Sequence, residues 1–280
     1  MSGGKISVDK IVITDLAYEL REGQTVIFIQ DAPKPRGAHD LKPEAVLYMD
    51  RHILVAVKPA GILTVPFERG DKGTFDQQLR SFLARREKRN ARKKGALPSL
   101  MTVHRLDKAT SGVLVFARTW AAKEGLAKQF RDHSTAREYV ALVYGRATSK
   151  KIVSHILEDR GDGIRGSSET SPHPKVRRAA KGQRAVTHVK VQTEYKGVTL
   201  VTCKLETGRT NQIRIHMSED GHPLIGERIY MRGFKDERIY SERLMLHAAH
   251  LGFNHPVTQE KMTFKAPLPS AFQTIICDVT

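Results

Sequence analysis

The sequence has 280 residues, enough for one large domain with a sizeable core, with or without a small appendage. Lys and Arg number 47 against 30 Asp and Glu, so the formal net charge is +17 and the pI is about 10.0. This excess of positive charge predicts a polyanionic partner that is bound less tightly as salt rises. The two cysteines, Cys203 and Cys277, lie far apart, which excludes a disulfide scaffold and a cysteine zinc site.

The sequence does not predict a membrane protein. The N-terminal residues 1–5 lack the apolar core of a signal peptide, and no apolar stretch approaches the length of a membrane-spanning helix. A basic amphipathic helix with a broad apolar face and a lipidation signal are also missing. We therefore expect a soluble, monomeric protein of the reducing cytoplasm, with no membrane partner.

Residues 1–40 are expected to form a small N-terminal extension. Two short apolar runs, 11–13 and 26–29, predict strands, and the prolines and glycine of 33–37 place a boundary before the main body at 41–280. About forty residues are too few for a strong core of their own. Either this piece docks on the main body, or it is a partial binding module. Its Leu-x-x-Gly-x-x-Val pattern resembles the end of an S4 RNA-binding domain.

The main body begins with two predicted strands and a helix. The strands are residues 46–50 and 53–57, and the second stops at the turn Lys58-Pro59-Ala60-Gly61. Behind Thr74, apolar residues recur at helical spacing, which predicts an amphipathic helix whose aromatic residues belong to the core and do not stack on bases. The helix leads into residues 85–94, with seven basic residues and one acid. This run is either a solvated helix end or an arm that follows phosphates.

Residues 104–112, with the sequence His-Arg-Leu-Asp-Lys-Ala-Thr-Ser-Gly, contain the most informative motif. One carboxylate, Asp107, stands among basic and hydroxyl side chains, and the apolar run 113–117 that follows predicts a buried strand. Asp107 would thus lie in a loop that enters a rigid sheet, a common place for reactive groups. An Asp before Thr-Ser-Gly is also typical of a turn. Spacing alone leaves both interpretations open.

Further elements follow the motif. Thr119 is expected to cap a helix that carries Ala122, Leu126 and Phe130 on one face. The next strands are predicted as antiparallel neighbours, with a hairpin turn at 196–197 and a mobile basic loop at 159–184 inside the domain. The predicted strands of this half are residues 137–143, 185–195, 198–205, 244–251 and 262–264.

A short helix at 211–218, stopped by Gly221, would place Arg214 at the edge of the core with its guanidinium reaching a cleft. Together these elements predict an α+β fold: a mixed, largely antiparallel sheet with flanking helices and a central cleft.

The sequence lacks a P-loop, a dinucleotide fingerprint, a zinc deaminase signature and a His-Glu-x-x-His motif, so we expect neither cofactor nor metal. His247, His250 and His255 fall in an apolar strand and turn, where histidines are mostly structural. A carboxylate held ionised by an arginine and facing a sugar can act without a cofactor. For Asp107 that arginine would be Arg105 or Arg214. An ordinary glycoside hydrolase would need a second carboxylate, for which there is no clear candidate.

The motif of Asp107 resembles the signature of the RluA-type pseudouridine synthases, which isomerise uridine in RNA. Four other segments resemble further motifs of that family, and all five occur in the family's order, from about residue 44 to the end. They are Val55–Gly61, His104–Gly112, Arg137–Gly145, Leu205–His216, and Leu246–Ala248 with His255-Pro256. The chain departs from the family at Asn211, where a His is usual, which puts fine positioning in doubt.

The resemblance implies roles for individual residues. Asp107 would be the catalytic aspartate, attacking the anomeric carbon of the ribose or assisting an elimination. Tyr139 would stack on the flipped uracil, with a part in removing the proton from carbon 5. Arg214 would pair with Asp107, Arg209 being the weaker candidate, and Arg105 would enter the space that the base leaves. The basic residues expected to contact RNA are Lys58, Arg85, Arg86, Arg89, His104, Arg105 and Arg209.

The sequence thus predicts an RNA pseudouridine synthase, with ribosomal RNA favoured over transfer RNA because of the basic loops. The alternative is an RNA-binding or ribosome-assembly protein that keeps the fold without turnover. An intact Asp107, Tyr139 and Arg214 argues against that alternative. A glycosidase of free nucleosides is a third hypothesis, and the net charge of +17 argues against it.

Overall fold

The structure, a computed structural model, describes residues 6–8, 11–13, 22–28, 41–90, 99–171, 182–231 and 233–280. The chain divides into two compact units, Met1–Leu41 and Lys42–Thr280. In the first, the strands β1 (Ile6–Val8), β2 (Ile11–Ile13) and β3 (Val26–Phe28) form an antiparallel sheet of order β2-β1-β3. The two predicted strands are confirmed as β2 and β3, and β1 is a third that was not predicted. The S4-like nature of this unit stays a prediction.

The larger unit is built on one eleven-stranded sheet of order β10-β9-β11-β12-β8-β13-β7-β5-β4, with β14 beside β13 and β6 beside β7. Among the described strands β13 and β7 pair in parallel and the other pairs are antiparallel. The strands are β4 (Val46–Met49), β5 (Ile53–Lys58), β6 (Met101–Thr102), β7 (Ser111–Ala117), β8 (Ala136–Tyr144), β9 (Lys150–Leu157), β10 (Gly166–Ser167), β11 (Gln183–Tyr195), β12 (Val198–Leu205), β13 (Leu246–Asn254) and β14 (Lys261–Lys265). The predicted mixed, largely antiparallel sheet is confirmed.

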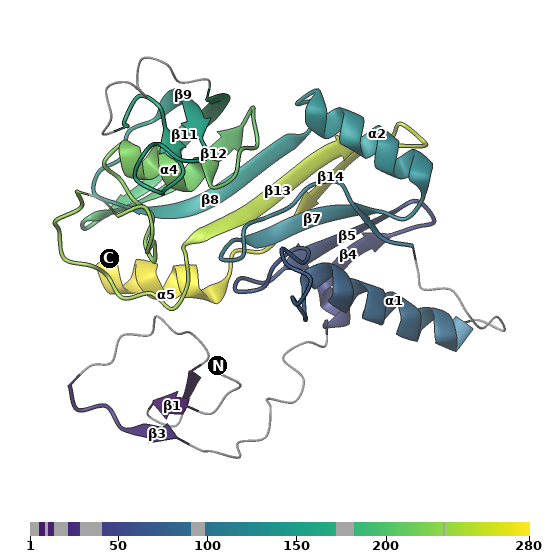
Figure 1. Cartoon of the computed structure of the whole chain (residues 1–280), viewed down its shortest axis with the longest axis horizontal. Coiled ribbons are helices and arrows are strands. Elements are labelled where there is room, and N and C mark those ends of the chain that lie inside the picture. Colours follow the sequence, from purple (N-terminus) through teal and green to yellow (C-terminus); the bar gives the residue numbers. More distant parts are fainter. Residues whose placement is uncertain are drawn as a thin grey trace. The chain divides into compact units, whose positions relative to one another are not determined.

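Helices cover both faces of this sheet (Figure 1). They are the 3₁₀ turn η1 (Pro43–Ala45) and the α-helices α1 (Phe75–Asn90), α2 (Trp120–Arg131), α4 (Gln212–Glu219) and α5 (Ser270–Val279). None of the described helices has both the length and the apolar composition needed to cross a membrane.

Alternation along β7 and β8 assigns each helix to a face, because successive side chains of a strand point to opposite sides. In β7, Val115 packs in the cluster that contains Leu126 of α2, whereas Phe116 contacts Phe75 of α1. In β8, Ala141 shares a cluster with Ile213 and Met217 of α4, whereas Leu142 packs with Phe272 of α5. The helices α2 and α4 therefore share one face, and α1 and α5 cover the other (Figure 1).

Most predicted elements are confirmed. Thr119 caps α2 through a hydrogen bond from the backbone N–H of Ala122, and Phe75 of α1 is fully buried, as expected of a core residue. Gly197 in the β11–β12 hairpin and Gly221 after α4 both have a positive φ, so both predicted turns are present. Strands β6, β9 and β10 and helix α5 were not predicted.

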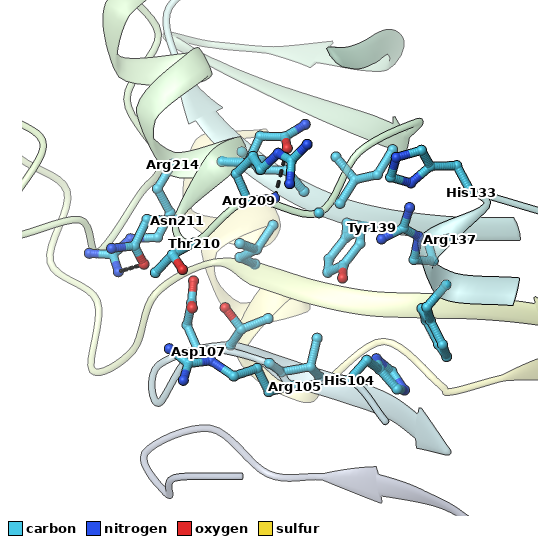
Figure 2. Close-up of a pocket in the computed structure, with 18 of the residues that line it drawn as sticks. His104, Arg105, Asp107, His133, Arg137, Tyr139, Arg209, Thr210, Asn211 and Arg214 are labelled. Carbon is cyan, nitrogen blue, oxygen red and sulfur yellow. Dashed lines mark hydrogen bonds between the residues drawn. The ribbon is translucent and has the colours of Figure 1, made fainter. Parts of the chain in front are cut away.

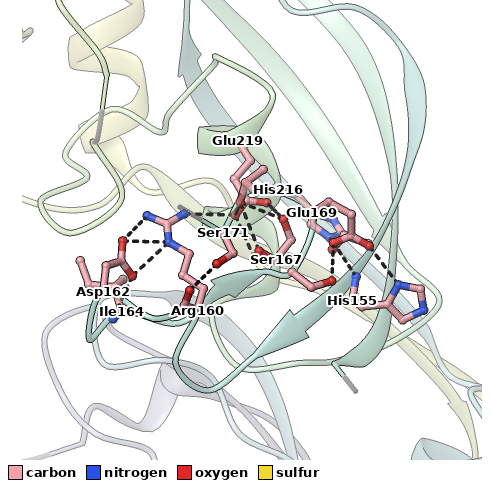
Figure 3. Close-up of polar contacts among 12 residues, drawn as sticks. His155, Arg160, Asp162, Ile164, Ser167, Glu169, Ser171, His216 and Glu219 are labelled. Carbon is pink, nitrogen blue, oxygen red and sulfur yellow. Dashed lines mark hydrogen bonds and ion pairs between the residues drawn. The ribbon is translucent and has the colours of Figure 1, made fainter. Parts of the chain in front are cut away.

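The prediction of a mobile loop at 159–184 is wrong for its first half (Figure 3). Arg160 forms ion pairs with Asp162 at 3.0 Å and with Glu219 of α4 at 3.5 Å. The Glu219 carboxylate also accepts hydrogen bonds from the backbone N–H of Ser167 (2.9 Å) and from the hydroxyl of Thr170 (2.7 Å). Residues 160–170 are thus tied to the C-terminal end of α4. Residues 172–181 lie outside the described residues.

Candidate active site

Asp107 lies in the loop between β6 and β7, and its side chain projects into a cleft between α2 and α4 (Figure 2). Backbone bonds fix the loop on both sides: Thr64 Oγ1 donates to Leu106 O at 2.8 Å, and Gly61 N–H donates to Lys108 O at 2.8 Å. Within the described part of the chain, the carboxylate of Asp107 has no hydrogen bond or ion pair. The loop is thus held in place, and the carboxylate is available to a ligand.

The cleft has a volume of about 650 Å³, within the usual range of small-molecule sites and large enough for a nucleotide. Its walls come from four parts of the fold: the Asp107 loop, α2, β8 and the start of α4. Basic and hydrogen-bonding side chains make up much of the lining (Figure 2). They include Arg105, Arg131, His133, Arg137, Arg209, Thr210, Asn211 and Arg214.

Residues 107–110 of the motif form the turn that leads into β7, and Ser111 and Gly112 already belong to that strand. Thr110 N–H donates to Asp107 O at 3.1 Å, and the Ser111 hydroxyl contacts His247 Nδ1 at 2.7 Å in β13. Gly112 has a φ of +130°, and a Cβ there would collide with the backbone of Ala248. Glycine at this position allows β7 and β13 to approach closely beside Asp107. The predicted turn is therefore present at residues 107–110, whereas Ser111 and Gly112 form the start of β7.

We expect Gly112→Ala to lower the free energy of unfolding by about 3 kcal/mol, because a methyl group must displace backbone and adopt an unfavourable φ. The matched control is Gly197→Ala, since Gly197 also has a positive φ (+72°) but has open space where the Cβ of an alanine would lie. Gly197→Ala should lower the free energy of unfolding by only about 1 kcal/mol. Urea denaturation measures both values, and equal costs would contradict the close approach.

Burial raises the pKa of the Asp107 carboxyl above its usual value, and three cations, Arg214, Arg105 and Lys58, act against that rise. The charge of Glu227 acts in the same direction as burial. The site is therefore electropositive around a carboxylate that has no direct partner.

Arg214 does not form the expected ion pair with Asp107. Its Nε and NH2 each donate to the carboxylate of Glu227 at 2.7 Å, and NH1 donates to Asn211 Oδ1 at 2.9 Å. The guanidinium also lies over the ring of Tyr230, 5.0 Å from its centre. Glu227, in the turn after α4, supplies a fully buried acceptor for this arginine. Arg214 does line the cleft, as predicted.

Asn211 stands at the start of α4 with a left-handed backbone, φ +58°. Asparagine adopts this conformation more readily than most residues. Its amide accepts from Arg214 and donates to the hydroxyl of Tyr230 at 2.9 Å. Asn211, at the position where the family usually has His, thus forms hydrogen bonds with both Arg214 and Tyr230.

Tyr139 lies in the middle of β8 with its ring in the cleft (Figure 2). Burial raises the pKa of its hydroxyl to about 12, so the phenol is neutral at pH 7. Arg137, two residues earlier and so on the same face, also lines the cleft and donates to Glu206 O at 3.1 Å. Arg137 was not predicted as a site residue, although its alternation with Tyr139 could have indicated it.

Two of the basic residues expected to contact RNA make hydrogen bonds within the fold, and one of them, His104, also lines the cleft. Their contact with RNA stays a prediction. His104 Nε2 accepts a hydrogen bond from Val115 N–H at 3.1 Å, and its ring stacks on Phe130. Burial lowers the pKa of His104 to about 3, so the ring is neutral. Lys58 is fully buried, and Nζ donates to the carbonyls of Pro59 (3.0 Å) and Ile62 (2.8 Å). Burial lowers the pKa of Lys58 to about 7.

The other basic candidates separate into two groups. Arg105 and Arg209 line the cleft, and Arg209 Nε donates to Arg184 O at 3.0 Å. Arg85 and Arg86 are exposed on α1, which covers the opposite face of the sheet from α2, so the fold does not bring them to the cleft. The side chain of Arg89 lies outside the described residues.

No group of three or more His, Cys, Asp or Glu side chains gathers as a metal site in the described part of the chain.

Comparisons with known proteins place these features in context. Residues 52–219 match the family described as RNA pseudouridylate synthase. The chain is 37% identical, over 94% of its length and 82% of the relative, to ribosomal large subunit pseudouridine synthase D of Zymomonas mobilis. It is 33% identical, over 96% of its length and 82% of the relative, to the protein of the same name from Pseudomonas aeruginosa.

Solved structures show the same fold. Human RNA pseudouridylate synthase domain containing 4 superposes with a TM-score of 0.65 at 22% identity, over 82% of this chain and 90% of that chain. Human RNA pseudouridylate synthase domain containing 1 gives a TM-score of 0.61 at 24% identity, over 81% and 86%. At these identities the likeness concerns the fold alone.

Proposed function

The chain belongs to the RNA pseudouridylate synthase family, and from this membership we propose that it isomerises selected uridines of ribosomal RNA with Asp107 as its catalytic carboxylate. As a member of the family it is an isomerase that converts uridine in RNA into pseudouridine. One observation carries the assignment of Asp107: its carboxylate has no partner among the described residues and stands in a basic cleft of about 650 Å³.

The target uridine must leave its stack before it can enter the cleft. Extrusion of a base costs a few kcal/mol, and base stacking on an aromatic ring together with phosphate contacts can offset that cost. Tyr139 is one of two phenyl-type rings that line the cleft, and the other, Phe130, is already stacked on His104. Arg105, exposed at the cleft's opening, is placed to enter the gap that the base leaves, and Arg209 to contact the backbone.

In the proposed reaction Asp107 acts at the anomeric carbon of the ribose. By one route the carboxylate forms a bond to this carbon while the bond to N1 of uracil breaks, and by the other it assists an elimination. The released uracil turns, and its carbon 5 forms the new bond to the sugar, which frees the Asp107 carboxylate. Carbon 5 then loses its proton and N1 of the uracil gains one, which completes the isomerisation. No atom is gained or lost overall.

The last proton transfer is assigned to Tyr139 and Asp107 together. A phenol with a pKa of about 12 is not ionised at neutral pH, so it is a poor base on its own. It can accept a proton from carbon 5 while it gives its own proton to a stronger base. Asp107 is within electrostatic range of Tyr139, and burial raises its pKa, so it can take up that proton.

We expect Tyr139→Phe to bind RNA as tightly as the wild type but to form pseudouridine roughly a hundredfold more slowly, because the ring remains and the proton carrier is lost. Tyr139→Leu should also lose affinity, since base stacking on an aromatic ring contributes about 1–3 kcal/mol. Single-turnover rates and filter-binding constants separate the two effects. A Tyr139→Phe variant with the wild-type rate would exclude the hydroxyl from the reaction.

Ribosomal RNA is proposed as the substrate because the names of the Zymomonas and Pseudomonas relatives specify the large ribosomal subunit. The net charge of +17 fits a large polyanion but does not distinguish ribosomal from transfer RNA. A ribosomal substrate would place the enzyme in the cytoplasm, as the sequence predicts.

The test uses the purified full chain and unmodified transcripts of ribosomal and transfer RNA, with pseudouridine mapped at single-nucleotide resolution. Pseudouridine in ribosomal RNA alone supports the proposal. Product in transfer RNA alone would overturn the choice of substrate and leave the chemistry intact. Tight binding with unchanged uridines would favour the RNA-binding alternative, and free uracil would favour a glycosidase.

A further inference from the structure

A second groove opens on the face of the sheet opposite to the cleft of Asp107. Its volume is about 1050 Å³. In β8 the ring of Tyr139 lies in the cleft, so the neighbouring side chain of Glu138 points to the other face, where it lines the groove. Residues of β11 and β12 form the rest of the floor. We call it the back groove, and its floor residues are Glu138, His188, Lys190, Gln192, Thr202 and Lys204.

No helical residue in the described part of the chain lines the back groove. Helix α5 packs on the same face of the sheet, against Leu142 of β8 and Leu200 of β12. The back groove lies nearer the start of β8 and the end of β12, where Lys204 stands opposite Glu138 in the strand register. The polar side chains of its floor are therefore open to a partner.

The back groove meets the cleft at the edge of the sheet, where His133 and Arg209 stand (Figure 2). These two residues and Leu205 line both cavities. Arg209 Nε donates to Arg184 O at 3.0 Å, and Arg184, at the start of β11, also lines the back groove. A chain bound in the cleft can thus continue round this edge into the back groove.

The back groove carries an excess of positive charge, because four Lys and Arg side chains line it against two Glu. One of the two carboxylates, that of Glu206, is already bound by Lys151 Nζ at 3.0 Å and by His188 Nε2 at 2.6 Å. The side chains of Lys190 and Lys204 are exposed, and their ammonium groups have no hydrogen bond or ion pair with the described residues. Such a surface attracts a polyanion.

The residues that line the back groove favour a phosphate backbone over unpaired bases. None of them is Phe, Tyr or Trp, the rings on which unpaired bases stack. Paired RNA is bound instead through its phosphates and ribose hydroxyls, which Thr135, Gln192 and Thr202 can contact. Lys190 and Lys204 are diagonal neighbours on β11 and β12, so their Cβ atoms lie about 7 Å apart. The two ammonium groups can therefore contact different phosphates.

We propose that the back groove binds the sugar-phosphate backbone of a paired RNA stem that flanks the target uridine. This inference rests on the proposed function, because it starts from an RNA bound in the cleft. The flipped uridine occupies the cleft, and the stem passes Arg209 and lies on Lys190 and Lys204. Contacts to phosphates carry no sequence information of their own. They add affinity for RNAs that have a stem at the right place beside the target.

The experiment compares the wild type with Lys190→Gln/Lys204→Gln, which removes two charges and keeps polar side chains. Equilibrium binding is measured at several salt concentrations on two transcripts, a domain of ribosomal RNA that the wild type modifies and the shortest stem-loop of it that is still modified. The matched control is Lys196→Gln/Lys261→Gln. Both of these lysines are exposed, and neither lines the cleft or the back groove. Urea denaturation checks that the three proteins are equally stable.

On the long transcript we expect Lys190→Gln/Lys204→Gln to bind roughly 10- to 100-fold more weakly than the wild type near about 0.1 M salt, because two phosphate contacts and the counterions that they release are lost. The slope of the logarithm of the binding constant against the logarithm of salt concentration should become shallower by about 2. The loss on the short stem-loop should be smaller, so that most of the wild type's preference for the long transcript disappears. The control should keep this preference and the wild-type slope.

Equal affinities of Lys190→Gln/Lys204→Gln and the wild type for the long transcript would overturn the inference. A loss of the same size on both transcripts, or in the control variant, would also overturn it, because the effect would then not come from a flanking stem in the back groove. Binding needs no turnover. If the wild type forms no pseudouridine on any RNA, the proposed function fails. The same proteins are then compared on whole ribosomal RNA, where a loss confined to Lys190→Gln/Lys204→Gln still decides whether the back groove binds RNA.

Discussion

Asp107→Asn is expected to lower the rate of pseudouridine formation at least about a thousandfold, because the amide cannot act as the nucleophile or base. The change is isosteric, and the Asp107 carboxylate has no partner among the described residues, so the fold should be unaffected. RNA binding should stay within a few fold of the wild type, since the basic side chains that line the cleft are intact. Single-turnover kinetics on a modified transcript and equilibrium binding measure the two quantities.

The matched control for this variant is Asp278→Asn. Asp278 is exposed on α5, which covers the face of the sheet opposite to the cleft, and it undergoes the same chemical change. Its rate should equal that of the wild type. A residual rate in Asp107→Asn above about a tenth of the wild-type rate would show that another group carries the reaction. Loss of binding together with rate would instead make Asp107 a residue that shapes the cleft.

Arg214→Met is expected to lower the free energy of unfolding by about 3–5 kcal/mol, because it leaves the buried Glu227 carboxylate without its cation. The three backbone N–H groups that still bind Glu227 compensate only part of this loss. Activity should also fall, since the main cation that acts on Asp107 is removed. Urea denaturation and the single-turnover rate measure these effects.

A second substitution separates stability from function at this site. Adding Glu227→Gln to Arg214→Met removes the buried charge as well, so most of the lost stability should return. The activity should not return, because Arg214, the main cation that favours ionised Asp107, is still missing. A cost below about 1 kcal/mol for Arg214→Met alone would mean that the pair is solvated like a surface ion pair.

The main elements of the fold could be predicted because their patterns are strong. The apolar run of β7, the alternation in β12 and the four-residue spacing of α2 each report which face is buried. Strands β9 and β10 were missed because β9 lies at one side of the sheet with exposed residues in much of its length, and β10 has only two residues. Helix α5 is amphipathic, but its start carries no capping side chain.

The site could be predicted only in part. Two of the family motifs identified Asp107 and Tyr139, and the structure places both side chains in one cleft. The partner of Arg214 could not be predicted, because Glu227 lies in a turn where a charged side chain is expected to be solvated. The surroundings of Lys58 and His104, two residues expected to contact RNA, could not be predicted from the sequence either. Composition does not reveal that backbone carbonyls surround Lys58 or that His104 accepts from Val115.

The most direct test of the account maps pseudouridine across the ribosomal and transfer RNA of cells with the gene, cells without it, and cells complemented with Asp107→Asn. The account predicts that one or more uridines of ribosomal RNA lose the modification without the gene, regain it with the wild type, and stay unmodified with Asp107→Asn. Identical maps in all the strains, or restoration by Asp107→Asn, would contradict it.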